Sequence, residues 1–81
     1  MEKIHRIYEI EPDGTNHYIW SAEGNWEVTV KPDDCSFHCS RVGIDVYVYP
    51  ARAPESIIVY DDGANKHEFI FADGMLTPRA E

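Results

Sequence analysis

The chain has 81 residues, of which 43% are hydrophobic and 27% are charged, and this length and composition exclude a second domain, a disordered chain and a coiled coil. Asp and Glu number 15 and Lys and Arg number 7, which leaves a formal net charge of −8 at pH 7. This charge disfavours direct binding to nucleic acid or to an anionic membrane surface, because both attract Lys and Arg. No apolar run reaches the roughly 18 residues that a membrane-spanning helix needs.

The N-terminal part of the chain is predicted to form a β-hairpin. Residues 4–11 and 17–22 are rich in strand-forming residues, and between them lie Pro12 and Gly14, which favour a turn. Residues 4–8 also fit a short helix, since their apolar residues fall at helical spacing, and this alternative stays open.

Two segments in the middle of the chain alternate between apolar and other residues, as half-buried strands do. Trp26, Val28 and Val30 share one side of the first segment. In the second segment, residues 42–48, Val or Ile stands at every second position. Both are predicted strands, and we assign Trp20 and Trp26 to the core.

The C-terminal half contains a second predicted hairpin and two loops. Residues 57–60 and 68–71 are dense in strand-forming residues and flank a turn at residues 61–66. Residues 31–40 and 50–54 do not alternate and contain three prolines, which lack a ladder donor, so both are predicted loops.

Together these segments predict a mainly β fold with little or no helix. We expect a small antiparallel meander of five to six strands that forms a twisted sheet or a small open barrel. Residues 1–76 would form a single β-rich domain and residues 77–81 a frayed C-terminal tail. A core this small is thin, and dimerisation is one way to compensate for it.

Cys35, His38 and Cys39 lie within five residues and are ligand types that zinc prefers. A structural zinc site needs four ligands, and His5 and His17 fall roughly 16 Å apart along the predicted hairpin, so they cannot complete one site together. We therefore expect no metal and no cofactor, with both cysteines as buried thiols. A zinc site and a disulfide between the two cysteines are the alternatives.

No residue pattern in the chain supports catalysis, and we expect that the protein is not an enzyme. A Cys35 nucleophile with His38 as its base is disfavoured by Asp33 and Asp34, because nearby negative charge raises the pKa of a thiol. These two aspartates, like the pair at 61–62, fit turns, where Asp accepts backbone N–H groups. The chain contains none of the common phosphate-binding or hydrolase motifs.

Two features predict a surface that binds another protein. Residues 1–30 and residues 55–81 each carry six acidic and two basic residues, so they would form one negative face if the first and last strands are neighbours. Tyr47 and Tyr49 lie opposite the apolar side of their strand, and Tyr60 would continue the row. A solubility surface and a strand covered on both faces are the alternatives. The predicted partner-binding residues are Asp45, Tyr47, Tyr49, Tyr60, Asp61, Asp62 and Glu68.

These features predict a small acidic module that blocks a basic, nucleic-acid-binding surface of a partner protein. By size and acidity, and by no motif, the chain resembles the small inhibitors that phages direct at host defences, such as anti-CRISPR and antirestriction proteins. The resemblance implies an inhibitor whose carboxylates stand where phosphates would bind. The absence of an apolar signal segment and the two cysteines favour a cytoplasmic location. The alternative function is a structural subunit that assembles into a β-rich homo-oligomer, such as a homodimer, through an open strand edge.

Overall fold

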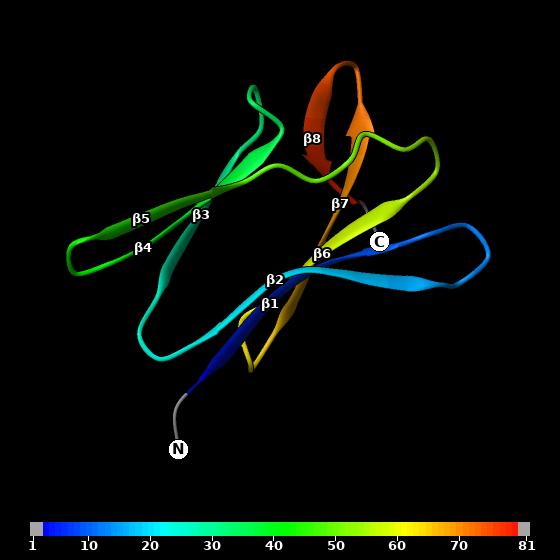
Figure 1. Ribbon diagram of the computed structural model, residues 1–81. Helices are drawn as coiled ribbons and strands as arrows, with labels where there is room; N and C mark the ends of the chain where they lie inside the picture. The colour runs from blue at the N-terminus through cyan, green and yellow to red at the C-terminus, as the bar shows by residue number, and fades with distance from the viewer. Residues whose placement is uncertain (1–2, 80–81) are drawn as a thin grey trace.

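The computed structural model describes residues 3–79 and shows two antiparallel β-sheets packed on each other (Figure 1). Sheet A has the strand order β2-β1-β6-β7-β8, and sheet B has the order β3-β4-β5. The prediction of an antiparallel β fold is confirmed, since no described residue is helical and neither sheet closes into a barrel. The strands are β1 (Ile4–Ile10), β2 (Asn16–Glu23), β3 (Glu27–Lys31), β4 (Ser36–Arg41), β5 (Ile44–Val48), β6 (Ile57–Asp61), β7 (Lys66–Ala72) and β8 (Met75–Pro78).

Both predicted hairpins are confirmed. β1 pairs with β2 as far as Ile10 and Asn16, and this strand rules out the helical alternative for residues 4–8. β6 pairs with β7 from Asp61 and Lys66 onwards. Gly14 and Gly63 adopt positive φ values of 90° and 92° in the two turns, a conformation that glycine reaches without a steric cost.

The N-terminal and C-terminal parts of the chain meet in sheet A. β1 pairs with β6 in an unbroken antiparallel register from Arg6 opposite Asp61 to Ile10 opposite Ile57. The acidic first and last segments of the sequence therefore share one sheet, although β1 is next to β6 and not next to the last strand.

The prediction of a loop over residues 31–40 is wrong, because this segment contains β4, the middle strand of sheet B. Phe37 and Cys39 are fully buried and alternate with the half-buried His38 and Ser40. In this strand Phe and Cys alternate with His and Ser, and this alternation is difficult to recognise from hydropathy alone. Only the turn before Ser36 has the irregular structure that the sequence predicted.

The predicted strand over residues 42–48 begins two residues later, at Ile44. Val42 and Gly43 form the tight turn between β4 and β5, and Val42 is 99% exposed. Gly43 has a φ of 78°, which allows a two-residue turn to join the two strands at this point.

Two residues of the predicted C-terminal tail, Thr77 and Pro78, lie in β8. The backbone N–H of Arg79 donates to the Glu68 carbonyl (2.9 Å), and its guanidinium binds the Glu68 carboxylate (2.7 Å). β8 is an edge strand, and a proline is tolerated there because no strand on its outer side needs a backbone N–H from Pro78. The last two tail residues lie outside the described part of the chain.

The core lies between the two sheets and centres on Phe37. The Phe37 ring meets the Phe69 ring edge-on, with 5.5 Å between the centroids, and lies 6.4 Å from the Tyr60 ring. Trp20 and Trp26, which the sequence assigned to the core, pack edge-to-face at its border and are partly buried. None of the described residues forms a helix long and apolar enough to cross a membrane.

Candidate partner-binding surface

Alternate connections between antiparallel strands return to the same side of the molecule, and the four that follow β1, β3, β5 and β7 lie along the top and the right-hand side of Figure 1. Ile10 pairs with Ile57, so the connection after β1 lies beside the one before β6. The backbone N–H of Leu76 donates to the Pro32 carbonyl (3.1 Å), which joins the turn before β4 to the turn before β8. These four connections span residues 11–15, 32–35, 49–56 and 73–74.

This end of the molecule carries most of the uncompensated negative charge. Its connections contain six carboxylates and one cation, Arg52, which is a formal charge of −5. The connections at the opposite end, residues 24–26, 42–43 and 62–65, contain one charged residue, Asp62. We call the six carboxylates the acidic end: Glu11, Asp13, Asp33, Asp34, Glu55 and Asp73.

The negative potential of the acidic end acts on His17. Its Nε2 lies 3.0 Å from the Glu11 carboxylate, and this hydrogen bond and charge, followed by the charges of Glu9 and Asp13, raise the pKa of the imidazole. Protonation of His17 would cancel one negative charge at the edge of the acidic end, so the charge of this surface depends on pH.

We expect the Glu11→Gln substitution to lower the pKa of His17 towards its ordinary value of 6.5, because the substitution removes the largest cause of the shift. An NMR titration of the imidazole resonances measures this change, with Glu27→Gln as a control for a carboxylate on another strand. An unchanged His17 pKa in Glu11→Gln would show that the pair does not form in solution.

Three of the predicted binding residues lie together on the outer face of sheet B, next to the acidic end. Tyr49 is the first residue after β5, so it belongs to an acidic-end connection, and it is 64% exposed. Tyr47, 52% exposed, stacks on the His38 ring with 4.6 Å between centroids. His38 Nε2 lies 2.9 Å from Asp45 Oδ1. Exposed aromatic side chains held by a neighbour on a strand are suited to contact another protein.

Tyr60 does not continue this row, because its side chain lies between the sheets. His5 Nε2 donates to the Gly24 carbonyl (3.1 Å), so His5 Nδ1 is left to accept from the Tyr60 hydroxyl (2.8 Å). Burial, followed by the negative charge of Asp62, raises the pKa of Tyr60 to about 12. The hydroxyl is therefore a structural donor.

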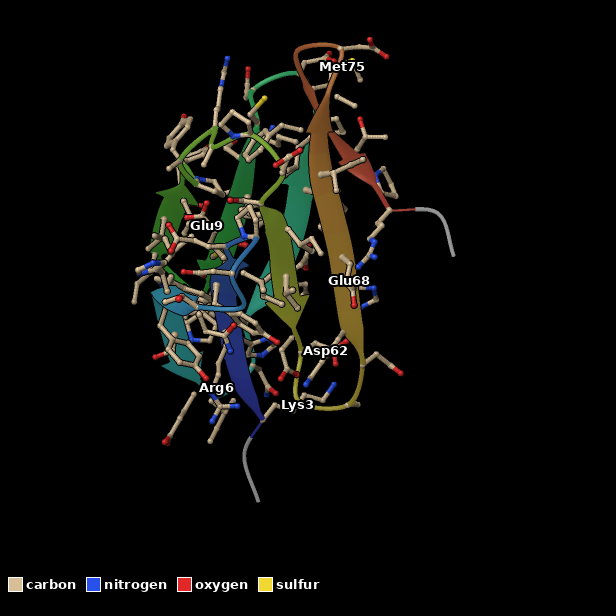
Figure 2. The ribbon with its side chains drawn as sticks, turned by 90° about the vertical axis from the view of Figure 1, so that its right-hand side faces the viewer. Lys3, Arg6, Glu9, Asp62, Glu68 and Met75 are labelled. Carbon is tan, nitrogen blue, oxygen red and sulfur yellow. The ribbon has the colours of Figure 1, made fainter. Side chains whose placement is uncertain are left out.

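Asp61, Asp62 and Glu68 stabilise local structure away from Tyr47. Asp62 Oδ1 accepts the N–H groups of Asn65 and Ala64 in the turn between β6 and β7, which lowers the pKa of the Asp62 carboxyl to about 2. Asp61 Oδ1 likewise accepts the N–H of Gly63 in this turn (2.8 Å). The Glu68 carboxylate forms an ion pair with Arg79, which follows β8. Figure 2 shows Asp62 at this turn and Glu68 further along β7.

The two cysteines and His38 point in different directions. Cys35 and Cys39 are free, buried thiols, while His38 faces the outer side of sheet B. Cys39 and His38 are adjacent on a strand, so their side chains lie on opposite faces. Within residues 3–79, no three His, Cys, Asp or Glu side chains gather as metal ligands would.

Burial raises the pKa of Cys39 to about 11, two units above its ordinary value, so the native thiol carries roughly 100-fold less thiolate. We expect a chromogenic disulfide reagent to label Cys39 at least about 100-fold more slowly in the native protein than in the urea-unfolded protein. Mass spectrometry of time points in Cys35→Ser isolates this thiol. Equal rates in the two states would show that β4 does not bury it.

The acidic end was missed in the sequence because charge was counted along the chain. In a chain of antiparallel strands, alternate connections return to the same end, and the acidic residues fall in the first, third, fifth and seventh connections. Counting charge by alternate connections would have found this end, but only with all eight strands of residues 3–79 assigned.

Comparisons of the chain with protein-family models, with curated proteins and with solved structures found no match. The fold and the surface define a small, acidic, two-sheet β protein with six of its 15 acidic residues in the connections of the acidic end. The features of this surface that bear on function are that distribution of charge and the exposed tyrosines beside it.

Proposed function

We propose that this protein is a binding module that covers a basic, nucleic-acid-binding surface of a partner protein. The acidic end carries the proposal, because its loops hold six carboxylates with one cation among them. A partner surface that binds phosphates presents Lys and Arg, and carboxylates on neighbouring loops can pair with the same groups. The proposal includes no catalytic role and no cofactor.

The charge and the tyrosines have different roles in this proposal. Concentrated like charge destabilises the folded protein by self-repulsion, but it also attracts a basic partner and raises the association rate. Each exposed ion pair contributes only about 0.2–1 kcal/mol, so several pairs supply a few kcal/mol at most. Tyr47 and Tyr49 supply the apolar contact area that makes such a complex persist.

A phage-type inhibitor of a host defence, such as an anti-CRISPR or antirestriction protein, is the specific form of this proposal, and its support is the size and acidity of the chain. A cytoplasmic location belongs to the same proposal. The free thiols of Cys35 and Cys39 fit a reducing compartment, which is also where nucleic-acid-binding targets are found.

The proposal is tested by capture of partners from a lysate of the natural host, with bound proteins eluted by increasing salt and identified by mass. Asp33→Lys with Asp34→Lys reverses two exposed charges at the acidic end, and Glu23→Lys with Glu27→Lys makes the same change in charge away from it. We expect the wild type and the Glu23/Glu27 variant to retain a nucleic-acid-binding protein that the Asp33/Asp34 variant loses. Equal capture by both variants would rule out the acidic end as the binding surface.

A further inference from the structure

The outer face of sheet A, which points away from sheet B, is apolar along about half of the length of its strands. Val59 is 1% exposed and Tyr8 is 8% exposed, yet neither belongs to the core cluster between the sheets, which contains their neighbours Ile7 and Ile58. Successive side chains of a strand point to opposite faces, so Tyr8 and Val59 lie together on the outer face, where they are also paired in register.

Further apolar side chains extend this outer face. Ile10 and Ile57 are half-buried and form the next registered pair on the same side, and Ile70 continues the row on β7. Tyr18 is 67% exposed, with its ring 5.4 Å from that of Tyr8. An antiparallel sheet with one solvated face normally carries polar residues there. This face instead resembles one that another layer covers.

The charges on this outer face are balanced, in contrast to the rest of the protein. Arg6, Asp61 and Lys66 form a row of alternating sign across β1, β6 and β7. Glu68 and Arg79 form an ion pair of 2.7 Å beside them. These five residues sum to +1 on a chain of −8, so the charged row itself adds little like-charge repulsion when two copies meet on this face.

We propose that a second copy of this chain packs on the outer face of sheet A, with a two-fold axis that runs parallel to β1 and β6 and midway between them. Such an axis exchanges the members of every registered pair of these strands, so Arg6 faces Asp61 of the partner subunit and Ile10 faces Ile57 of the partner subunit. Each contact occurs twice in the dimer. Charged side chains face side chains of opposite charge, and apolar side chains face apolar side chains. Figure 2 shows Arg6 on β1, with the strands of sheet A side by side.

The size of the face determines how tightly the copies associate. The axis places β2, β1, β6 and β7 opposite β7, β6, β1 and β2 of the partner subunit, while β8 lies outside the contact. Four strands at about 4.8 Å spacing and roughly 20 Å in length give a contact of about 400 Å² in projection. Stable complexes bury about 800 Å² on each partner, so we expect a dimer that dissociates on dilution. The axis leaves both acidic ends on the same side, which makes the dimer a two-headed acidic surface. The dimer does not depend on the proposed function.

Sedimentation equilibrium of the full chain over a range of concentrations tests the dimer. We expect the wild type to reach twice its chain mass of 9.3 kDa at high concentration. Arg6→Glu alone and Asp61→Lys alone should each stay monomeric, because like charges then face each other across the axis. An equimolar mixture of the two variants should dimerise again, because both facing pairs are then of opposite sign.

A second pair of variants, Ile10→Lys and Ile57→Glu, leaves the Asp61 turn contact intact. Each variant alone places a charge against an apolar side chain of the partner subunit and should stay monomeric, whereas the mixture brings Lys and Glu together and should dimerise. The matched control is Arg41→Glu with Asp45→Lys, which changes equivalent charges on sheet B and should leave the dimer intact. A wild type that remains monomeric at every concentration overturns the proposal. A dimer that survives in both single variants, or folded variants that do not associate when mixed, places the interface elsewhere, such as a strand edge, and also overturns it.

Discussion

Phe37→Ala is expected to lower the free energy of unfolding by about 3–5 kcal/mol. Phe37 is fully buried in the middle strand of sheet B and contacts the rings of Phe69 and Tyr60 on sheet A. A half-open pocket of about 190 Å³ already borders Phe37, Val28 and Tyr60, so the loss of the ring would enlarge a space that the surrounding side chains leave unfilled. A chain of 81 residues has roughly 4–12 kcal/mol of stability, so a substantial part of it would be lost.

Urea unfolding followed by tryptophan fluorescence measures this change, since Trp20 and Trp26 both border the core. Tyr49→Ala, which removes an exposed ring of similar size, is the control and should change stability by less than about 0.5 kcal/mol. A loss below about 1 kcal/mol in Phe37→Ala would mean that β4 does not contribute the centre of the core.

Asp33→Lys with Asp34→Lys is expected to lower the association rate with a basic partner by about 10-fold or more at low salt, and to change the dissociation rate much less. Both carboxylates are exposed in the turn before β4, so they act through long-range attraction and not through buried contacts. The difference from the wild type should shrink as salt is added, because the Debye length falls to about 8 Å at physiological ionic strength.

Surface plasmon resonance with the purified partner measures both rates. Glu23→Lys with Glu27→Lys is the matched control and should reduce the association rate by a smaller factor, since its charges lie on β2 and β3 away from the acidic end. Tyr47→Ala should have the opposite kinetic signature, a faster dissociation with little change in association. Equal association rates for the two charge variants would mean that net charge alone, and not its position, attracts the partner.

Local patterns in the sequence were sufficient to predict the β1–β2 and β6–β7 hairpins and the strand at Val28 and Val30. They failed at β4 because the small side chains of Cys39 and Ser40 differ little in hydropathy and so give no clear alternation. Pro32 and the two aspartates after it also made the predicted loop longer than the observed one. They failed at Val42 because Gly43 completes a turn there, and a β-branched residue before a glycine also fits a continuing strand. Pairing between β1 and β6 depends on packing between distant segments, which a local pattern does not contain.

The candidate surface was predictable in part. Tyr47 and Tyr49 were found because alternation along one strand places them opposite Val46 and Val48, and the structure keeps them exposed beside Asp45. Asp61 and Asp62 were also recognised as typical of a turn, and the turn contacts are what the structure shows. The acidic end depends on which connections share an end of the molecule, so it required the complete order of strands.

Competition with nucleic acid shows whether this protein occupies the nucleic-acid-binding surface of its partner. The partner captured from the host is loaded with a labelled oligonucleotide that it binds, and this protein is added at increasing concentration while fluorescence anisotropy is followed. We expect the oligonucleotide to be released in proportion to the protein bound, and Asp33→Lys with Asp34→Lys to release it only at much higher concentration. A stable ternary complex, with the oligonucleotide still bound at saturation, would show that the protein does not cover the nucleic-acid-binding surface.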